Sequence, residues 1–251
     1  MDLTFTIIFF FLGLIFGSFL NSVIWRLHSK ESFLSCHSIC TSCRHILAWK
    51  DLLPLFSFIF LGRRCRYCSQ KISWQYPLVE LFTAILFVVF YWQLALSWLL
   101  LFNLVFLLFL IIIFVYDLRY YLILDKVSVP AMIVALIASL LLGVSFWGLI
   151  LAVIVGGGFF FLQFLISHGK WIGGGDIRLG VVMGLMLGWP KILVALVLAY
   201  FIGSIISVIL VIVGKKKMAS TVPFGTFLAL STVVTLLWGN IILDWYLALV
   251  W

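Results

Sequence analysis

Charged residues are scarce in this sequence. Of its 251 residues only 10% are Asp, Glu, Lys or Arg, and just eight are acidic. Soluble globular domains carry about 25% charged residues, so this scarcity excludes an ordinary soluble protein. The apolar fraction is 66% and the mean hydropathy is +1.31. Together these values predict an all-α, polytopic membrane protein.

A basic N-terminal segment is also missing. A secretory signal peptide begins with positive charge, but Asp2 is the only charged residue before Arg26. The apolar run that follows, residues 3–25, is long enough to cross a bilayer. We therefore expect it to be retained as a transmembrane helix rather than removed.

The two signs of charge are not balanced, since the net charge is +8. In a soluble protein this excess would suggest nucleic-acid binding, but in a membrane protein basic residues mark the cytoplasmic loops. Apolar runs of about 20 residues predict the spans. We expect about eight, of which the fourth and sixth are short: residues 3–25, 77–96, 97–116, 127–143, 146–167, 177–189, 192–213 and 224–242.

The basic residues also orient these spans. If the polar segment after the first span is cytoplasmic, 15 of the 16 Lys and Arg residues face that side and only Lys191 lies outside. The positive-inside rule therefore favours a cytoplasmic polar segment and two outward-facing termini. Lys215, Lys216 and Lys217 then fix the topology, with attraction of anionic lipid or substrate as the alternative.

Cysteines are few, yet four of the five form two C-x2-C pairs in the polar segment: Cys40, Cys43, Cys65 and Cys68. This spacing is typical of a four-thiolate zinc site. A polar segment of about 50 residues has little core of its own, so a metal would supply much of its folding energy. The alternatives are two disulfides, which a cytoplasmic location disfavours, or thiols that bind nothing. His37 and His45 are possible substitute ligands, and Cys36 is left without a role.

Two acids adjoin bilayer-length apolar sequence: Asp117 follows residues 97–116, and Asp176 precedes residues 177–189. A carboxylate in such a place is costly, about 2.5–3.5 kcal/mol at a helix centre, and is therefore a functional-site candidate. The predicted topology puts both at the cytoplasmic face. Two carboxylates that share a proton can activate water and protonate a scissile carbonyl. The alternative is that the acids pair with Arg119 and Arg178.

Gly173, Gly174 and Gly175 directly precede Asp176. Without side chains they allow a substrate backbone to approach closely and can take unusual φ values, so we expect this loop to border the site. A third acid, Asp125, is expected to cap the fourth span.

Further motifs accompany these residues in a fixed order along nearly the whole chain: Gly17-Ser18-Phe19-Leu20-Asn21, Trp25-Arg26-Leu27, the cysteine pairs, Tyr76-Pro77-Leu78-Val79-Glu80-Leu81, Asp117-Leu118-Arg119, Gly173-Gly174-Gly175-Asp176 and Val222-Pro223-Phe224-Gly225. Tyr-Asp with Gly-x-Gly-Asp resembles the GxGD-type aspartic membrane peptidases, presenilin-like enzymes included. The full set resembles the bifunctional type IV prepilin leader peptidase/N-methyltransferase family.

This resemblance implies an enzyme of the bacterial inner membrane that serves pilus, competence or secretion systems. Such enzymes cleave the short basic leader of prepilins or pseudopilins after a glycine at the cytoplasmic face. They then methylate the new N-terminal residue, commonly phenylalanine, with S-adenosylmethionine.

By motif match, Asp117 and Asp176 are the catalytic aspartates, and Cys40, Cys43, Cys65 and Cys68 hold structural zinc. The implied domains are transmembrane helix 1–25, a zinc-binding, methyltransferase-associated loop 26–76 and a transmembrane peptidase domain 77–251. Leu124 and Thr226 stand where the family tends to have proline, which affects loop geometry but no catalytic position.

The methyltransferase half has fewer signals, because no glycine-rich nucleotide loop is readable. Glu80 is the matched candidate for binding S-adenosylmethionine, with a helix-start acid favoured by the dipole as the alternative. Gly17, Ser18 and Asn21 are further candidates, or else residues that let two spans pack closely.

Two rival functions remain at this stage. One is a peptidase without methyltransferase activity. The other is a non-enzymatic assembly factor that binds a partner through its zinc-binding loop.

Overall fold

The computed structural model describes residues 2–31, 37–214 and 222–250. Cys36 lies outside the described residues, and so do Lys215, Lys216 and Lys217, whose predicted role in fixing the topology stays a prediction. The chain forms two compact units, Met1–Leu100 and Leu101–Trp251. Each unit is described by itself below.

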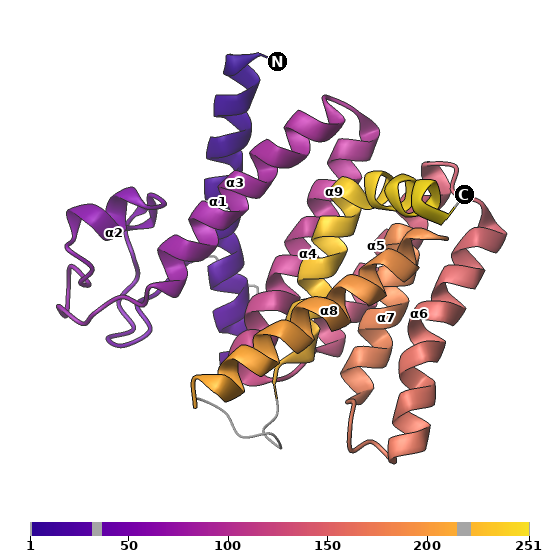
Figure 1. Cartoon of the computed structure of the whole chain (residues 1–251). Helices are drawn as coiled ribbons and strands as arrows, with labels where there is room; N and C mark the ends of the chain where they lie inside the picture. The colour runs from indigo at the N-terminus through magenta and orange to yellow at the C-terminus, as the bar shows by residue number, and fades with distance from the viewer. Residues whose placement is uncertain (1, 32–36, 215–221, 251) are drawn as a thin grey trace. The chain divides into compact units, whose positions relative to one another are not determined.

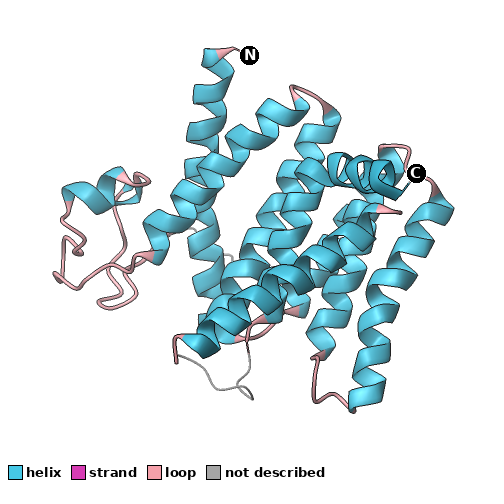
Figure 2. Ribbon diagram, viewed as in Figure 1, coloured by secondary structure: helices cyan, strands magenta, loops and turns pink. Residues whose placement is uncertain are grey.

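Eight long helices form where the sequence predicts them (Figures 1 and 2): α1 (Leu3–Ser29), α3 (Gln75–Leu94), α4 (Trp98–Tyr120), α5 (Asp125–Leu141), α6 (Phe146–Ser167), α7 (Gly174–Leu187), α8 (Lys191–Ile212) and α9 (Phe224–Val250). The described ranges contain no strand, which confirms the all-α prediction. Six of the helices are long and apolar enough to cross a membrane. The other two, α5 and α7, are short as predicted, with 17 and 14 residues.

The first unit is a helix pair with a polar loop. Helices α1 and α3 cross each other in Figure 1, and glycine permits the close approach. A Cβ atom on Gly13 would lie 2.5 Å from the Ala84 Cα, and one on Gly17 would lie 2.7 Å from the Glu80 Cα. The loop between α1 and α3 contains the 3-10 helix η1 (Trp49–Leu52) and the short helix α2 (Phe56–Phe60). The sequence did not predict either of these.

Helix α7 is the centre of the second unit. It packs against α5, α6, α8 and α9, and its side chains Leu179, Val182 and Met183 are fully buried. A helix hydrophobic on all sides is expected in the core of a bundle. Because four helices pack against α7, the packing of the whole unit determines where the N-terminal end of α7 lies.

Glycines bring α6 and α7 into backbone contact, and the two helices run side by side in Figure 1. A Cβ on Gly156 would lie 2.4 Å from the Gly180 carbonyl oxygen, and a Cβ on Gly180 equally close to that of Gly156. Small residues of this kind let membrane helices approach closely. The α6–α7 contact therefore depends on the absence of side chains at these two positions.

We predict that Gly156→Ala destabilises the protein by about 1–3 kcal/mol, the usual cost of forcing extra volume into a packed core. Gly158 lies two residues away on the same helix, and a Cβ there would have no atom within 4 Å. Gly158→Ala is therefore the matched control and should be neutral or stabilise by about 0.5–1 kcal/mol, because alanine favours helix. Thermal unfolding in detergent measures both, and equal effects of the two variants would contradict the packing.

Candidate active site

Asp117 lies in α4, three residues before the end of that helix, and is only 4% exposed. Its Oδ2 atom accepts two hydrogen bonds from Thr226, one from the backbone N–H at 2.7 Å and one from the hydroxyl at 3.0 Å. Thr226 is the third residue of α9, where backbone N–H groups have no partner within the helix and the dipole is positive. The start of α9 therefore holds the Asp117 carboxylate.

The Asp117 carboxylate packs closely against Gly225, and Ile123 packs against both Gly225 and Gly175. A Cβ on Gly225 would lie 3.0 Å from Asp117 Oδ2 and 2.8 Å from Ile123 Cδ1. A Cβ on Gly175 would lie 2.9 Å from Ile123 Cβ. Ile123 thus sits between two glycines, and side chains at either position would displace it. Three segments far apart in the sequence converge here.

Asp176 lies in the first turn of α7, where its Oδ2 atom accepts a hydrogen bond of 3.0 Å from the Gly173 N–H. It also interacts electrostatically with Asp117. The structure therefore brings the two sequence-predicted acids together in the second unit. None of the three preceding glycines has a positive φ, so the loop does not use the conformational freedom that glycine allows. Gly175 is required by the contact with Ile123 instead.

The neighbouring cations do not neutralise these two acids. Arg178 forms an ion pair with Asp125, the first residue of α5. In the parts of the chain that the structure describes, no ion pair includes Asp117 or Asp176. The prediction that Asp125 caps α5 is wrong, because the N-cap residue is Leu124 and no side chain caps it. Asp125 and Arg178 connect the starts of α5 and α7.

Asp117 and Asp176 are two carboxylates with no ion-pair partner among the described residues, and such a pair can act in acid–base catalysis. Two carboxylates that lie close enough to repel each other resist double ionisation, and such a pair holds one proton between its two members. A pair in that state holds one acid and one base in the same site. This is the requirement for hydrolysis by paired aspartates.

The four paired cysteines assemble in the first unit. The sulfur atoms of Cys40, Cys43, Cys65 and Cys68 all lie within 4.8 Å of one another, and those of Cys40 and Cys68 are 3.9 Å apart. All four are free thiols, so the disulfide alternative is wrong. Neither His37 nor His45 belongs to the cluster. The cluster could hold a metal ion.

The two cysteine pairs fold in the same way. In each, the N–H of the first cysteine donates to the carbonyl five residues later, at 2.9 Å for both Cys40 and Cys65. The residue four positions after that cysteine donates back to it and has a positive φ, at Arg44 and Ser69. An isolated antiparallel bridge closes each turn. Two equivalent turns thus each present two sulfurs to one centre.

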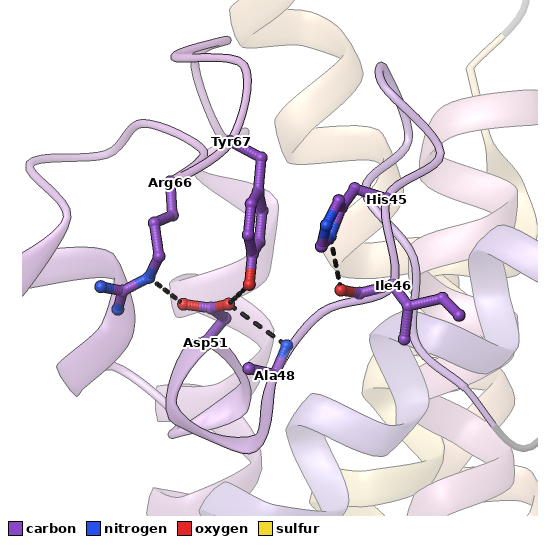
Figure 3. Close-up of polar contacts among 6 residues, drawn as sticks. All are labelled: His45, Ile46, Ala48, Asp51, Arg66 and Tyr67. Atoms are coloured by element: carbon purple, nitrogen blue, oxygen red, sulfur yellow. Dashed lines mark hydrogen bonds and ion pairs between the residues drawn. The ribbon is translucent and has the colours of Figure 1, made fainter.

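Asp51, for which no role was predicted, links the segments of the loop that carry these turns (Figure 3). Its carboxylate, with a side chain 3% exposed, accepts hydrogen bonds from Arg66 Nε at 2.8 Å, from the Tyr67 hydroxyl at 3.2 Å and from the Ala48 N–H at 3.2 Å. Burial raises the pKa of Asp51, but the bonds from Arg66 and Ala48 outweigh it and hold the pKa below its ordinary value. The Tyr67 ring also stacks on His45, with centroids 3.7 Å apart. Asp51 therefore ties η1 to the second turn, and Tyr67 ties that turn to the first.

Glu80 is a buried carboxylate, 6% exposed, at the junction of α3, α1 and the loop. Its Oε2 atom accepts the Leu55 N–H at 2.8 Å, and the Ser18 hydroxyl also hydrogen-bonds to it. Asn21 donates to the Tyr76 carbonyl at 3.0 Å close by. No described Lys, Arg or His nitrogen lies within 4.0 Å of the Glu80 carboxylate. Glu80 is thus a buried acid held only by neutral donors.

Comparison with known proteins gives a consistent family. Residues 11–94 match the family model described as "Bacterial Peptidase A24 N-terminal domain", and residues 104–208 match "Type IV leader peptidase family". A protein of Aeromonas salmonicida (strain A449) named "Prepilin leader peptidase/N-methyltransferase" is 30% identical, over 98% of this chain and 94% of the relative. A Bacillus subtilis (strain 168) protein of the same name is 32% identical, over 96% of this chain and 97% of the relative. No solved structure matches the chain.

We predict that the purified chain binds one metal ion through the cysteine cluster and that Cys65→Ser removes it, because a tetrahedral site needs all four ligands. Metal content by mass spectrometry is the measurement. Chelation should make residues 37–74 sensitive to protease, since this loop buries little apolar surface and metal binding supplies its folding energy.

The matched control is Cys36→Ser, which changes a cysteine that we do not expect to be a ligand. Full metal content in this variant and none in Cys65→Ser would support the assignment. An equal loss in both variants would show that the ligand set is wrong.

Proposed function

This chain belongs to the type IV leader peptidase family, and on that basis we propose that it is a prepilin leader peptidase/N-methyltransferase. Its substrates are the precursors of type IV pilins or pseudopilins. It removes their leader and then methylates the new N-terminus. The observation that carries the peptidase half is that Asp117 and Asp176 interact electrostatically while no described Lys or Arg forms an ion pair with either acid.

In the proposed reaction, the aspartate pair acts on a water molecule and on the scissile peptide. The ionised carboxylate takes a proton from water as the water oxygen attacks the carbonyl carbon. The protonated carboxylate gives its proton to the carbonyl oxygen. The tetrahedral intermediate then collapses, the C–N bond breaks, and the leaving amine takes up a proton from the pair.

Thr226 holds Asp117 in position for this step. Both of its hydrogen bonds reach Oδ2, so the other oxygen is left to face water or the second acid. Fixed donors at a carboxylate reduce the reorganisation that the reaction would otherwise require. The Asp125–Arg178 ion pair holds the starts of α5 and α7, and hence the register of Asp176.

The proposed placement is the bacterial inner membrane, with both termini outside and the active site at the cytoplasmic face. The distribution of Lys and Arg supports this orientation. A precursor then lies with its apolar helix in the bilayer and its basic leader in the cytoplasm, where the basic leader can reach the aspartate pair.

We further propose that the metal is structural zinc. A zinc ion bound by four thiolates at about 2.3 Å has sulfur atoms about 3.8 Å apart. The Cys40–Cys68 separation of 3.9 Å suits this geometry. Among the described residues, the cluster consists of four cysteine sulfurs and contains no weaker ligand that a water molecule could replace. A structural role therefore fits better than a catalytic one.

For the methyltransferase half, Glu80 is the proposed contact to S-adenosylmethionine, which supplies an electrophilic methyl group when bound. A buried carboxylate without a cation is costly, and a cationic ligand would relieve that cost. Ser18 and the Leu55 N–H orient the carboxylate. A peptidase without this second activity is the rival function, and a non-enzymatic assembly factor is another.

We expect Asp117→Asn and Asp176→Asn each to reduce leader cleavage by at least about a thousandfold, because an amide cannot exchange the proton that the reaction needs. Mass spectrometry of a co-expressed precursor measures the product. Asp244→Asn, at an exposed site in α9, is the control and should cleave normally. Cleavage by either active-site variant would favour the assembly factor.

We expect Glu80→Gln to cleave the precursor at a near-normal rate while methylation falls at least about tenfold, since the amide keeps the volume but loses the charge that binds a cation. The readout is the mass of the mature N-terminal peptide, which methylation raises by about 14 Da. Glu31→Gln makes the same change at a less buried position and should methylate normally. If the wild-type product never gains this mass, the chain is a peptidase alone.

A further inference from the structure

A polar pair connects two of the membrane-spanning helices of the second unit. The Tyr200 hydroxyl of α8 donates a hydrogen bond of 2.9 Å to Gln163 Oε1 of α6. Tyr200 is 37% exposed and Gln163 is half-buried. Both lie in otherwise apolar spans. Polar groups in hydrocarbon are costly unless they have partners, so the donor and acceptor that this bond leaves unused can bind a polar ligand favourably.

The pair adjoins the active site. Tyr200 interacts electrostatically with Asp176. Its ring packs on Phe224, with centroids 5.0 Å apart, and Phe224 directly precedes Gly225 and Thr226, which contact Asp117. The Tyr200 ring therefore lies against the start of α9, whose next two residues contact Asp117.

The hydrogen bond between Tyr200 and Gln163 leaves one acceptor group and one donor group unused. Because the Tyr200 hydroxyl donates its proton to Gln163, its oxygen still has lone pairs that can accept. Because Gln163 accepts through Oε1, its Nε2 atom still has N–H groups to donate. One acceptor and one donor side by side complement the N–H and C=O of a peptide backbone.

A peptidase substrate within a membrane needs such a complement. A transmembrane helix satisfies all its backbone groups internally. The scissile bond lies where the basic leader meets this helix, so its exposure to two aspartates requires the adjoining helical turn to unwind, which frees N–H and C=O groups at the membrane boundary. Protein groups beside the scissile bond must then bind them.

We propose that Tyr200 and Gln163 bind the backbone of the precursor where it unwinds next to the scissile bond. The Tyr200 oxygen accepts a substrate N–H, and Gln163 Nε2 donates to a substrate carbonyl. Both are substrate-positioning residues rather than acids or bases of the reaction. This inference rests on the proposed peptidase function.

The test is a double-mutant cycle between enzyme and substrate. Precursor peptides carry an N-methyl group at one backbone amide at a time, at each position flanking the scissile bond but not at that bond. With the wild-type chain, one position should lose about two- to tenfold in kcat/KM, the value of one hydrogen bond. Tyr200→Phe, which keeps the ring contacts, should show a similar loss with the unmodified peptide and no additional loss at that position.

A second variant and a control complete the experiment. Gln163→Leu removes the acceptor that orients the Tyr200 hydroxyl, so it should lose sensitivity to the same N-methyl position. Tyr246→Phe, at an exposed tyrosine of α9, should keep the wild-type pattern. Fully additive losses at every position in both variants would overturn the inference and assign the pair a role in helix packing only. Absence of cleavage by the wild-type chain would instead contradict the proposed function itself.

Discussion

The second unit depends on keeping a carboxylate ionisable inside an apolar helix bundle. Asp117 is almost fully buried, and a lone charge there would destabilise the fold. At the start of α9, the backbone N–H and the hydroxyl of Thr226 both donate hydrogen bonds to this carboxylate and offset that cost. Glycine at position 225 is then unavoidable, because a side chain would contact the carboxylate. The chemistry of one side chain thus determines how α4 and α9 meet.

Glycine, which has no side chain, also determines the position of α7. This helix is surrounded by four others, and only glycine at Gly156 and Gly180 allows backbone contact with α6. The tight packing leaves little freedom to shift along the helix axis. Asp176 is consequently presented to Asp117 by a rigid element, whereas the loop before it contributes one hydrogen bond from Gly173.

The sequence predicted the features that depend on local pattern. Helix positions followed from runs of apolar residues, and the cysteine cluster from two C-x2-C pairs. Thr226 was noticed only as a departure from proline, because its bond to Asp117 joins residues 109 positions apart. The hydrogen bonds of Asp51 and the bond between Tyr200 and Gln163 were missed for the same reason. Asp125 was predicted to cap a helix because it precedes a span, but its carboxylate forms an ion pair with Arg178 of a different helix.

The shortness of α7 bears on how water reaches the site. Its 14 residues extend about 21 Å at 1.5 Å per residue, against a hydrocarbon thickness of about 30 Å. Such a helix cannot reach both surfaces of an undeformed bilayer. Either one end of α7 lies below the headgroup level, or the lipid thins around the helix. If the lipid thins next to Asp176, the headgroup level comes closer to the active site and a hydrolytic water has a shorter path to the scissile bond.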